Sequence, residues 1–178
     1  MILIVCSVYS ATILKLSLLL KALKKQNLET KHFVYITDRK HANIKISREL
    51  ADLIIKATII LLFIQPFPSP DWVDPFDSYF NTIYSFIYCH PCAKGKTTLM
   101  APFVLQGSRF NKLDCQKILQ IIWDKSKANH FEIFPKTKME FLNPPKMIPN
   151  STTAVRALVL NSYYLQLIAL CEQKIKKS

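Results

Sequence analysis

Four hydroxyl-bearing side chains lie close together near the start of the chain, and the group that such a cluster can bind is a phosphate. They are Ser7, Tyr9, Ser10 and Thr12. The apolar run 1–6 precedes them and leucines recur at helical spacing in 13–23, which predicts a strand, a polar loop and a helix. Free backbone N–H groups and the dipole at the start of such a helix favour an anion. A strand–helix unit whose loop binds nothing has the same pattern, so both interpretations stand.

A second candidate chemistry is that of thiols, because Cys89 and Cys92 have the C-x-x-C spacing of redox pairs and zinc sites. The pair follows a predicted helix, whose dipole at that end has the wrong sign to stabilise a thiolate. A zinc ion would need further ligands. The candidates Cys115, His130 and Cys171 are distant in the sequence. We therefore predict no metal site.

Two further motifs have explanations that need no ligand. The segment Gly95-Lys96-Thr97 is similar to the end of a phosphate-binding loop, but His90 stands where that loop needs its first glycine. A strand is also predicted after it, where the motif requires a helix. Three carboxylates could bind a metal or act as acid and base, but capping at the start of a helix accounts for the last two. These carboxylates are Asp71, Asp74 and Asp77.

The elements that would position these residues alternate between strand and helix. We predict strands at 1–6, 31–36, 57–64, 96–105 and 130–134, and helices at 13–23, 47–54, 74–88, 111–127 and 151–177. The segments 37–45, 65–75 and 136–150 are predicted to be irregular. Such alternation predicts an α/β fold, a five-stranded doubly wound parallel sheet with helices on both faces, as one domain over 1–178. The loops 7–12, 65–74 and 106–109 would then follow the carboxyl ends of strands, where ligands of such sheets bind.

Apolar spacing within the helices selects the residues that we expect to face the core. They are Leu113, Ile118, Leu119, Ile122 and Trp123 in the fourth helix, and Val155, Leu158, Tyr163, Leu167 and Leu170 in the last. Ser47 is expected to cap the helix that follows it.

The composition narrows the class of protein further. Half of the 178 residues are apolar, so we expect a real core, and the net charge is +12. The basic residues are scattered and are not interleaved with aromatics, so nucleic-acid binding is not expected.

No apolar run is long enough to span a membrane. Five cysteines without a regular framework favour a cytoplasmic protein with reduced thiols. Only 2 glycines are present, which counts against an intact cofactor site.

Several of these segments resemble the flavodoxin-like family, in particular its quinone reductase and NADPH-dependent FMN reductase branch. Ser7 and Thr12 match positions of that family's serine-rich phosphate loop. Pro68 and Pro75 have the spacing of its proline-containing loop, with Trp72 as the aromatic between them. Further matches are Ser85-Phe86-Ile87-Tyr88 in place of an aromatic tetrad, Gly95-Lys96 before the fourth strand, and Gln106-Gly107 in place of a Gly-Gly flavin loop.

The resemblance implies a flavin-dependent oxidoreductase that binds FMN or FAD non-covalently. Hydride would pass from NAD(P)H through the flavin to a quinone or a similar small-molecule acceptor. Ser7, Tyr9, Ser10 and Thr12 would hold phosphate. Pro68, Ser69, Pro70, Asp71 and Trp72 would border the isoalloxazine, and Gln106 and Gly107 would donate to its polar edge. The family's tyrosine and histidine after the fourth strand have no counterpart in 106–110, so no catalytic side chain is assigned.

Two other hypotheses remain. The glycine shortage would fit a non-catalytic flavodoxin-like domain that has lost its cofactor and binds a partner. The positive charge would fit a basic anion-binding module for nucleic acid or an acidic membrane. The family commonly dimerises, and the aromatic helix 76–88 is a candidate homodimer interface, although its aromatic residues would equally suit the core.

Overall fold

The computed structural model describes residues 1–7, 16–35, 47–64, 66, 78–89, 91, 93, 96–105, 112–147 and 154–177. The strands of the main sheet are β1 (Ile2–Ser7), β2 (Thr30–Tyr35), β3 (Ile59–Ile64), β4 (Thr97–Pro102) and β6 (Glu132–Ile133). Two short strands, β5 (Val104–Leu105) and β7 (Lys146–Met147), form a separate pair. The helices are α2 (Leu16–Lys25), α3 (Arg48–Lys56), α4 (Ser78–Cys89), α5 (Lys112–Ala128), α6 (Lys138–Leu142) and α7 (Ala154–Ile175).

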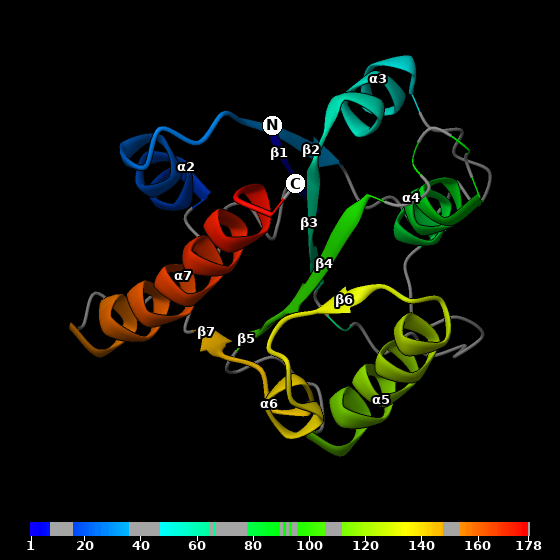
Figure 1. The fold of residues 1–178 in the computed structure, drawn as a ribbon. Helices are drawn as coiled ribbons and strands as arrows, with labels where there is room; N and C mark the ends of the chain where they lie inside the picture. Colours follow the sequence, from blue (N-terminus) through cyan, green and yellow to red (C-terminus); the bar gives the residue numbers. More distant parts are fainter. Residues whose placement is uncertain are drawn as a thin grey trace.

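The main sheet has the strand order β2-β1-β3-β4-β6, and each neighbouring pair is parallel. Figure 1 shows β3 and β4 at its centre. All six residues of β3 are buried, which explains why its sequence is a continuous apolar run. The predicted five-stranded, doubly wound parallel sheet is therefore confirmed.

Helices cover both faces of the sheet. Successive side chains of each strand point to opposite sides, so each face presents apolar side chains that a layer of helices buries. In β3, Ile59, Leu61 and Phe63 pack in one core cluster with residues of α2 and α7. The alternate residues Ile60, Leu62 and Ile64 pack in a second cluster with residues of α3, α4 and α5. The two clusters place α2 and α7 on one face and α3, α4 and α5 on the other (Figure 1).

The predicted cap at the start of α3 is confirmed. The backbone N–H of Leu50 donates to Ser47 Oγ over 3.2 Å, which satisfies one of the free donors of the first turn. In the part of the chain that the structure describes, no helix combines the length and the apolar character that crossing a bilayer requires.

Two helices end in the same hydrogen-bonded motif, although neither end carries a glycine. After α5, His130 N–H donates to Lys127 O over 3.1 Å and Phe131 N–H donates to Ser126 O over 2.9 Å. This is the Schellman pattern, in which the residue after the helix takes the left-handed conformation that suits glycine. His130 has φ 59°, and Asn27 has φ 55° at the equivalent position after α2.

Replacing His130 with glycine is expected to raise the free energy of unfolding by about 0.5–1 kcal/mol. A side chain in the left-handed region costs about 1–2 kcal/mol, and part of the gain is offset by the greater backbone entropy of unfolded glycine. Urea denaturation would measure the change. Lys127→Gly, inside the last turn of α5, is the matched control and should lower stability by about 1 kcal/mol. A loss of stability in His130→Gly would show that the imidazole itself holds the helix end.

The predicted strand 96–105 is wrong in its second half. β4 ends at Pro102, and Val104–Leu105 pairs with Lys146–Met147 outside the main sheet. Pro102 has no N–H to donate to a ladder. The N–H of Phe103 donates to the carbonyl of Ile64, the last residue of β3, over 3.0 Å. Beyond this bond the chain turns away and pairs with β7.

The prediction that 136–150 is irregular is also wrong, because this segment contains α6 and β7. Thr137 caps α6: its Oγ accepts from the N–H of Glu140 over 3.3 Å, and its hydroxyl donates to the Glu140 carboxylate over 2.6 Å. The Thr-x-x-Glu spacing is visible in the sequence and is a known helix-start signal. Phe141 of α6 is fully buried against the ring of Trp123 on α5, with 5.3 Å between ring centroids.

Most predicted core positions are confirmed, and one is wrong. The buried ones are Ile118, Leu119, Ile122, Tyr163, Leu167 and Leu170. Trp123 is half-buried against the cluster that contains Ile118, Leu119 and Ile122. Leu113 lies in the first turn of α5 and is 61% exposed. The side chains of Val155 and Leu158 lie outside the described residues.

Candidate functional site

The carboxyl ends of β1, β3 and β4 lie side by side at one edge of the sheet. Ile64 at the end of β3 is in register with Pro102 at the end of β4, and Val5 of β1 is in register with Leu62 of β3. β1 then ends at Ser7. The predicted loops 7–12 and 65–74 therefore begin at neighbouring points, whereas the predicted loop 106–109 follows β5, which pairs with β7 outside the main sheet (Figure 1).

The loops themselves lie outside the described residues. This holds for most of the predicted cofactor-binding residues, namely Tyr9, Ser10, Thr12, Pro68, Ser69, Pro70, Asp71, Trp72, Gln106 and Gly107. Ser7 is described as the last residue of β1, without its side chain. The structure thus describes where the three loops start, and the roles of these residues stay predictions.

The sheet edge beneath the loops is apolar and uncharged. Phe63, Ile64 and Phe103 are 2%, 5% and 0% exposed, and Pro66 is buried as well. Cys6, next to the end of β1, is buried, and this burial raises the pKa of its thiol to about 12. The thiol is therefore protonated at neutral pH and is a poor nucleophile. Charged or polar contacts to a ligand must come from the loops.

The end of β4 is held in place from the α7 side. The hydroxyl of Tyr163 donates to the carbonyl oxygen of Pro102 over 3.2 Å, and its ring packs edge-on against Phe134 with centroids 5.2 Å apart. Burial raises the pKa of Tyr163 well above its usual value, so the hydroxyl keeps its proton and remains a donor. The N–H of Phe134 donates to the carbonyl of Met100 in β4 over 2.9 Å. These bonds fix the end of β4, the strand that precedes β5 and the third loop.

The similarity of 95–97 to a phosphate loop has a structural explanation. Lys96 precedes β4 at its amino end, which is opposite to the edge where the three loops begin. Its Nζ donates to the carbonyl oxygens of Ile55 and Ala57, each over 2.6 Å, and so satisfies acceptors at the end of α3. Sequence reasoning missed this role, because the acceptors lie 41 and 39 residues earlier in the chain.

The thiol and metal candidates do not come together within the described residues. Cys6, Cys115 and Cys171 are buried free thiols, and Cys89 is exposed at the end of α4. Cys92 lies outside the described residues. In the described part of the chain, no three or more His, Cys, Asp or Glu side chains are grouped so that they could hold a metal ion.

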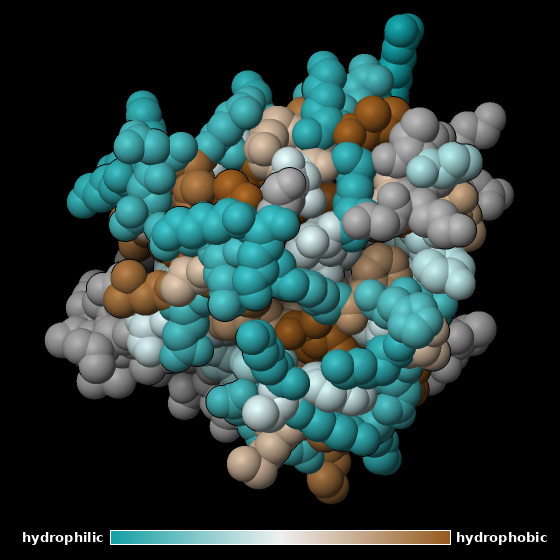
Figure 2. Space-filling view, in the orientation of Figure 1, coloured by the Kyte–Doolittle hydropathy of each residue, from teal (hydrophilic) through white to brown (hydrophobic). Residues whose placement is uncertain are grey.

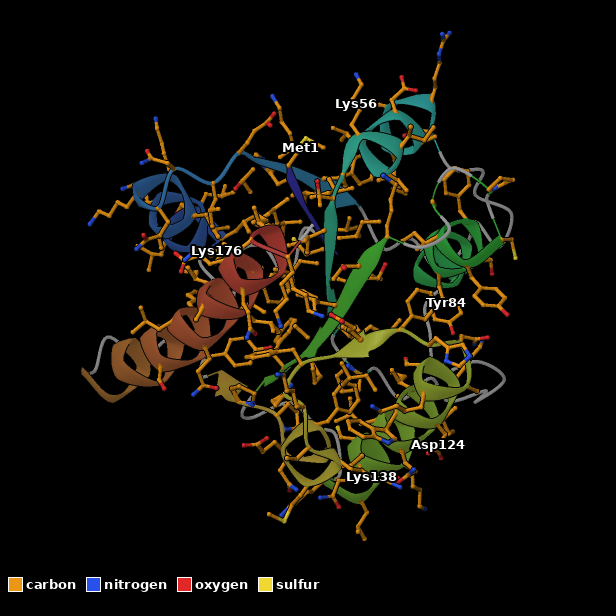
Figure 3. All side chains as sticks on the ribbon, in the orientation of Figure 1. Met1, Lys56, Tyr84, Asp124, Lys138 and Lys176 are labelled. Carbon is orange, nitrogen blue, oxygen red and sulfur yellow. The ribbon has the colours of Figure 1, made fainter. Side chains whose placement is uncertain are left out.

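The described part of the aromatic helix packs into the core. Tyr84 and Ile87 are buried in the cluster that α4 shares with α5. Tyr84 is labelled in Figure 3. Asn129 Nδ2 donates to Tyr84 Oη over 2.5 Å, and the Tyr84 ring packs against that of Phe131 with centroids 4.8 Å apart. Burial raises the pKa of Tyr84. Tyr88 is 50% exposed and is thus an aromatic residue of this helix that is accessible to the expected homodimer interface.

A separate hollow of about 620 Å³ lies between the segment after β6 and helix α7. Its lining includes Phe134, Pro135, Lys136, Glu140, Leu170 and Gln173. The carboxylate of Glu140 already accepts from Thr137. This hollow follows the carboxyl end of β6, the outermost strand of the sheet, two strands away from β3.

No protein-family model matches the sequence, and no curated protein matches it either. Solved structures match at low identity. The flavodiiron protein from Giardia intestinalis has a TM-score of 0.53 at 11% identity, over 98% of this chain and 36% of that protein, so this chain spans about a third of its length. General stress protein 14 of Treponema denticola, solved in complex with FMN, has a TM-score of 0.52 at 13% identity, over 95% and 98% of the two chains.

An NADPH-quinone reductase from P. pentosaceus also matches, with a TM-score of 0.50 at 10% identity, over 92% of this chain and 94% of that chain. Identities this low show the fold and nothing finer. The strand order agrees with these matches. When the five strands of the main sheet are counted along the chain, β2-β1-β3-β4-β6 is the order 2-1-3-4-5, which is that of the flavodoxin-like fold. The chain therefore has the flavodoxin-like fold.

Proposed function

We propose that this chain binds FMN or FAD at the carboxyl edge of β1, β3 and β4 and acts as a flavin-dependent oxidoreductase. The proposal rests on one observation, which is that the chain leaves β1 and β3 toward opposite faces of the sheet. These strands are neighbours, yet β1 leads to α2 on one face of the sheet and β3 leads to α4 on the other. Loops that leave adjacent strands toward opposite faces open a crevice between them, and this crevice is where such sheets bind ligands.

The described surroundings suit a flavin. The end of β3 is apolar and buried at Phe63, Ile64 and Pro66, and an apolar sheet edge would be compatible with a planar aromatic ring above it. The segment after Ser7 leads into α2, which begins at Leu16, so the first turn of α2 follows the hydroxyl-rich segment. Backbone N–H groups at such a helix start favour a phosphate. One of the matching structures contains FMN, and another is an NADPH-quinone reductase.

Each predicted residue then has a proposed role. Ser7, Tyr9, Ser10 and Thr12 would hold the phosphate, and Pro68, Ser69, Pro70, Asp71 and Trp72 would border the ring. Gln106 and Gly107 would donate to its polar edge. When bound, the flavin would supply the hydride chemistry between NAD(P)H and a quinone or similar acceptor. The protein would position the ring and exclude water.

The shortage of glycine is a property of the chain as a whole and is not confined to the proposed flavin site. Asn27 and His130 occupy left-handed positions after α2 and α5, where glycine is the usual residue. The chain thus replaces glycine with other residues at helix ends that have no ligand to bind. The absence of glycine from 7–12 is therefore weak support for the hypothesis that the cofactor was lost.

Purified protein is expected to show flavin absorbance or to gain thermal stability when FMN or FAD is added. A ligand at about a hundred times its dissociation constant adds roughly 2.7 kcal/mol. Ser7→Ala combined with Thr12→Val should weaken binding, whereas Ser17→Ala, on the exposed face of α2, should leave it unchanged. Colourless protein without any stabilisation by either flavin would overturn the proposal. Flavin binding without NAD(P)H oxidation would retain the site and overturn the oxidoreductase activity.

A further inference from the structure

Exposed lysines gather at the end of the molecule opposite to the proposed flavin site. In a parallel sheet with returning helices, the helices end at the edge where the strands begin. Besides Lys127 in the last turn of α5, whose Nζ lies over the Trp123 ring, six exposed lysines lie there, and we call these six the amino-edge lysines. They are Lys24 and Lys25 at the end of α2, Lys31 at the start of β2, Lys56 at the end of α3, and Lys176 and Lys177 after α7.

The figures show how broad this face is. Figure 3 labels Lys56 and Lys176, and in this view Met1 at the start of β1 lies between them. Figure 2 shows hydrophilic side chains gathered over α2, the last turns of α7 and helix α3. The lysines therefore come from elements on both faces of the sheet and surround the beginning of its central strands.

Neighbouring acids such as Glu29, Asp52 and Glu172 offset only part of the charge of the amino-edge lysines. None of the six forms an ion pair with another described residue. Lysines elsewhere do: Lys117 is 3.9 Å from Asp114, and Lys138 is 4.0 Å from Asp124. The exposed carboxylate nearest to them along the chain is that of Glu29, between Lys25 and Lys31. This face therefore carries a local excess of positive charge.

Helix dipoles explain only part of the cluster. A cation in the last turn of a helix is favourable, which accounts for Lys24, Lys25 and Lys56. Lys31 lies at the start of a strand, and Lys177 lies beyond the last turn of α7. Their presence at the same edge points to a shared anionic partner.

We propose that the amino-edge lysines dock this protein on membrane surfaces rich in anionic phospholipid. All six are lysine and none is arginine, whereas protein hot spots and base recognition rely on arginine and aromatic side chains. Flexible lysine stems spread over a broad face suit a fluid array of headgroups that can move to meet each charge. The proposal does not depend on flavin binding, and docking in this way would leave the flavin edge facing water.

Co-sedimentation with lipid vesicles tests the proposal. Binding is expected to mixed phosphatidylserine–phosphatidylcholine vesicles, not to phosphatidylcholine alone, and it should weaken with added salt. Each lysine near an anionic membrane strengthens binding roughly fivefold. Replacing Lys24, Lys31, Lys56 and Lys176 together with glutamine should therefore weaken binding on the order of a hundredfold or more.

The matched control removes the same charge elsewhere. Lys112, Lys117, Lys136 and Lys138 are exposed on the α5 and α6 side, and their replacement by glutamine should retain most of the binding. Circular dichroism would check that both variants fold. Equal losses in the two variants, or no dependence on phosphatidylserine, would overturn the proposal. Binding of duplex DNA through the same four lysines, without vesicle binding, would assign the face to nucleic acid instead.

Discussion

Replacing Phe103 with alanine is expected to lower the free energy of unfolding by about 3–5 kcal/mol, the cost of removing a fully buried aromatic ring. Phe103 is 0% exposed and belongs to the cluster that the sheet shares with α2 and α7. Its backbone also makes the last bond between β3 and the chain that continues from β4. The cavity would therefore open directly beneath the proposed flavin edge.

Urea denaturation of Phe103→Ala would measure this loss. Met139→Ala is the control, because Met139 is 76% exposed and its replacement should change stability by no more than about 0.5 kcal/mol. A loss below about 1 kcal/mol in Phe103→Ala would mean that the ring is not packed as described. The position of β5, and with it the junction between the two sheets, would then need revision.

Replacing Lys96 with methionine is expected to lower the free energy of unfolding by about 1.5–3 kcal/mol. Methionine keeps an unbranched apolar chain but removes the ammonium group, and hydrogen bonds to charged groups contribute about this much. Two carbonyl oxygens at the end of α3, those of Ile55 and Ala57, would lose their donor. The join between α3 and the start of β3 is thus expected to loosen.

Lys56→Met is the control for this second prediction. Lys56 is an exposed lysine at the end of the same helix, and it makes no ion pair with another described residue. Its replacement should change stability by about 0.5 kcal/mol at most. Equal effects of the two substitutions in thermal and urea denaturation would show that the ammonium of Lys96 has no special part in holding α3.

Where burial dictates residue type, the fold could be predicted from the sequence. β3 is buried on both faces, so Ile59–Ile64 is apolar throughout and its assignment is direct. The cap at Ser47 follows from local chemistry. The short elements β5 and β7 could not be predicted, because two-residue strands have no periodicity and their pairing joins positions about forty residues apart. The role of Lys96 likewise depends on a contact that only the folded sheet creates.

For the candidate site, the sequence could predict the edge but not the contacts. The convergence of Ser7, Ile64 and Pro102 follows from the strand order once alternation of strands and helices is recognised. Which hydroxyls or amides would meet a ligand depends on loop conformation, which neither propensity nor spacing determines. The anchoring of Pro102 by Tyr163 was not predicted, since a buried tyrosine on a helix gives no sign of the acceptor that it reaches.

The two outer strands of the sheet bear on how copies of this protein can associate. An unpaired strand edge offers a template for another chain, and proteins protect such edges with lysine or by keeping the strand short. β2 carries exposed Lys31 and His32, and β6 has only two residues. Growth of the sheet by intermolecular strand addition is therefore disfavoured at both margins, so aggregation by this route should be slow. Any pairing of two subunits should proceed through helices.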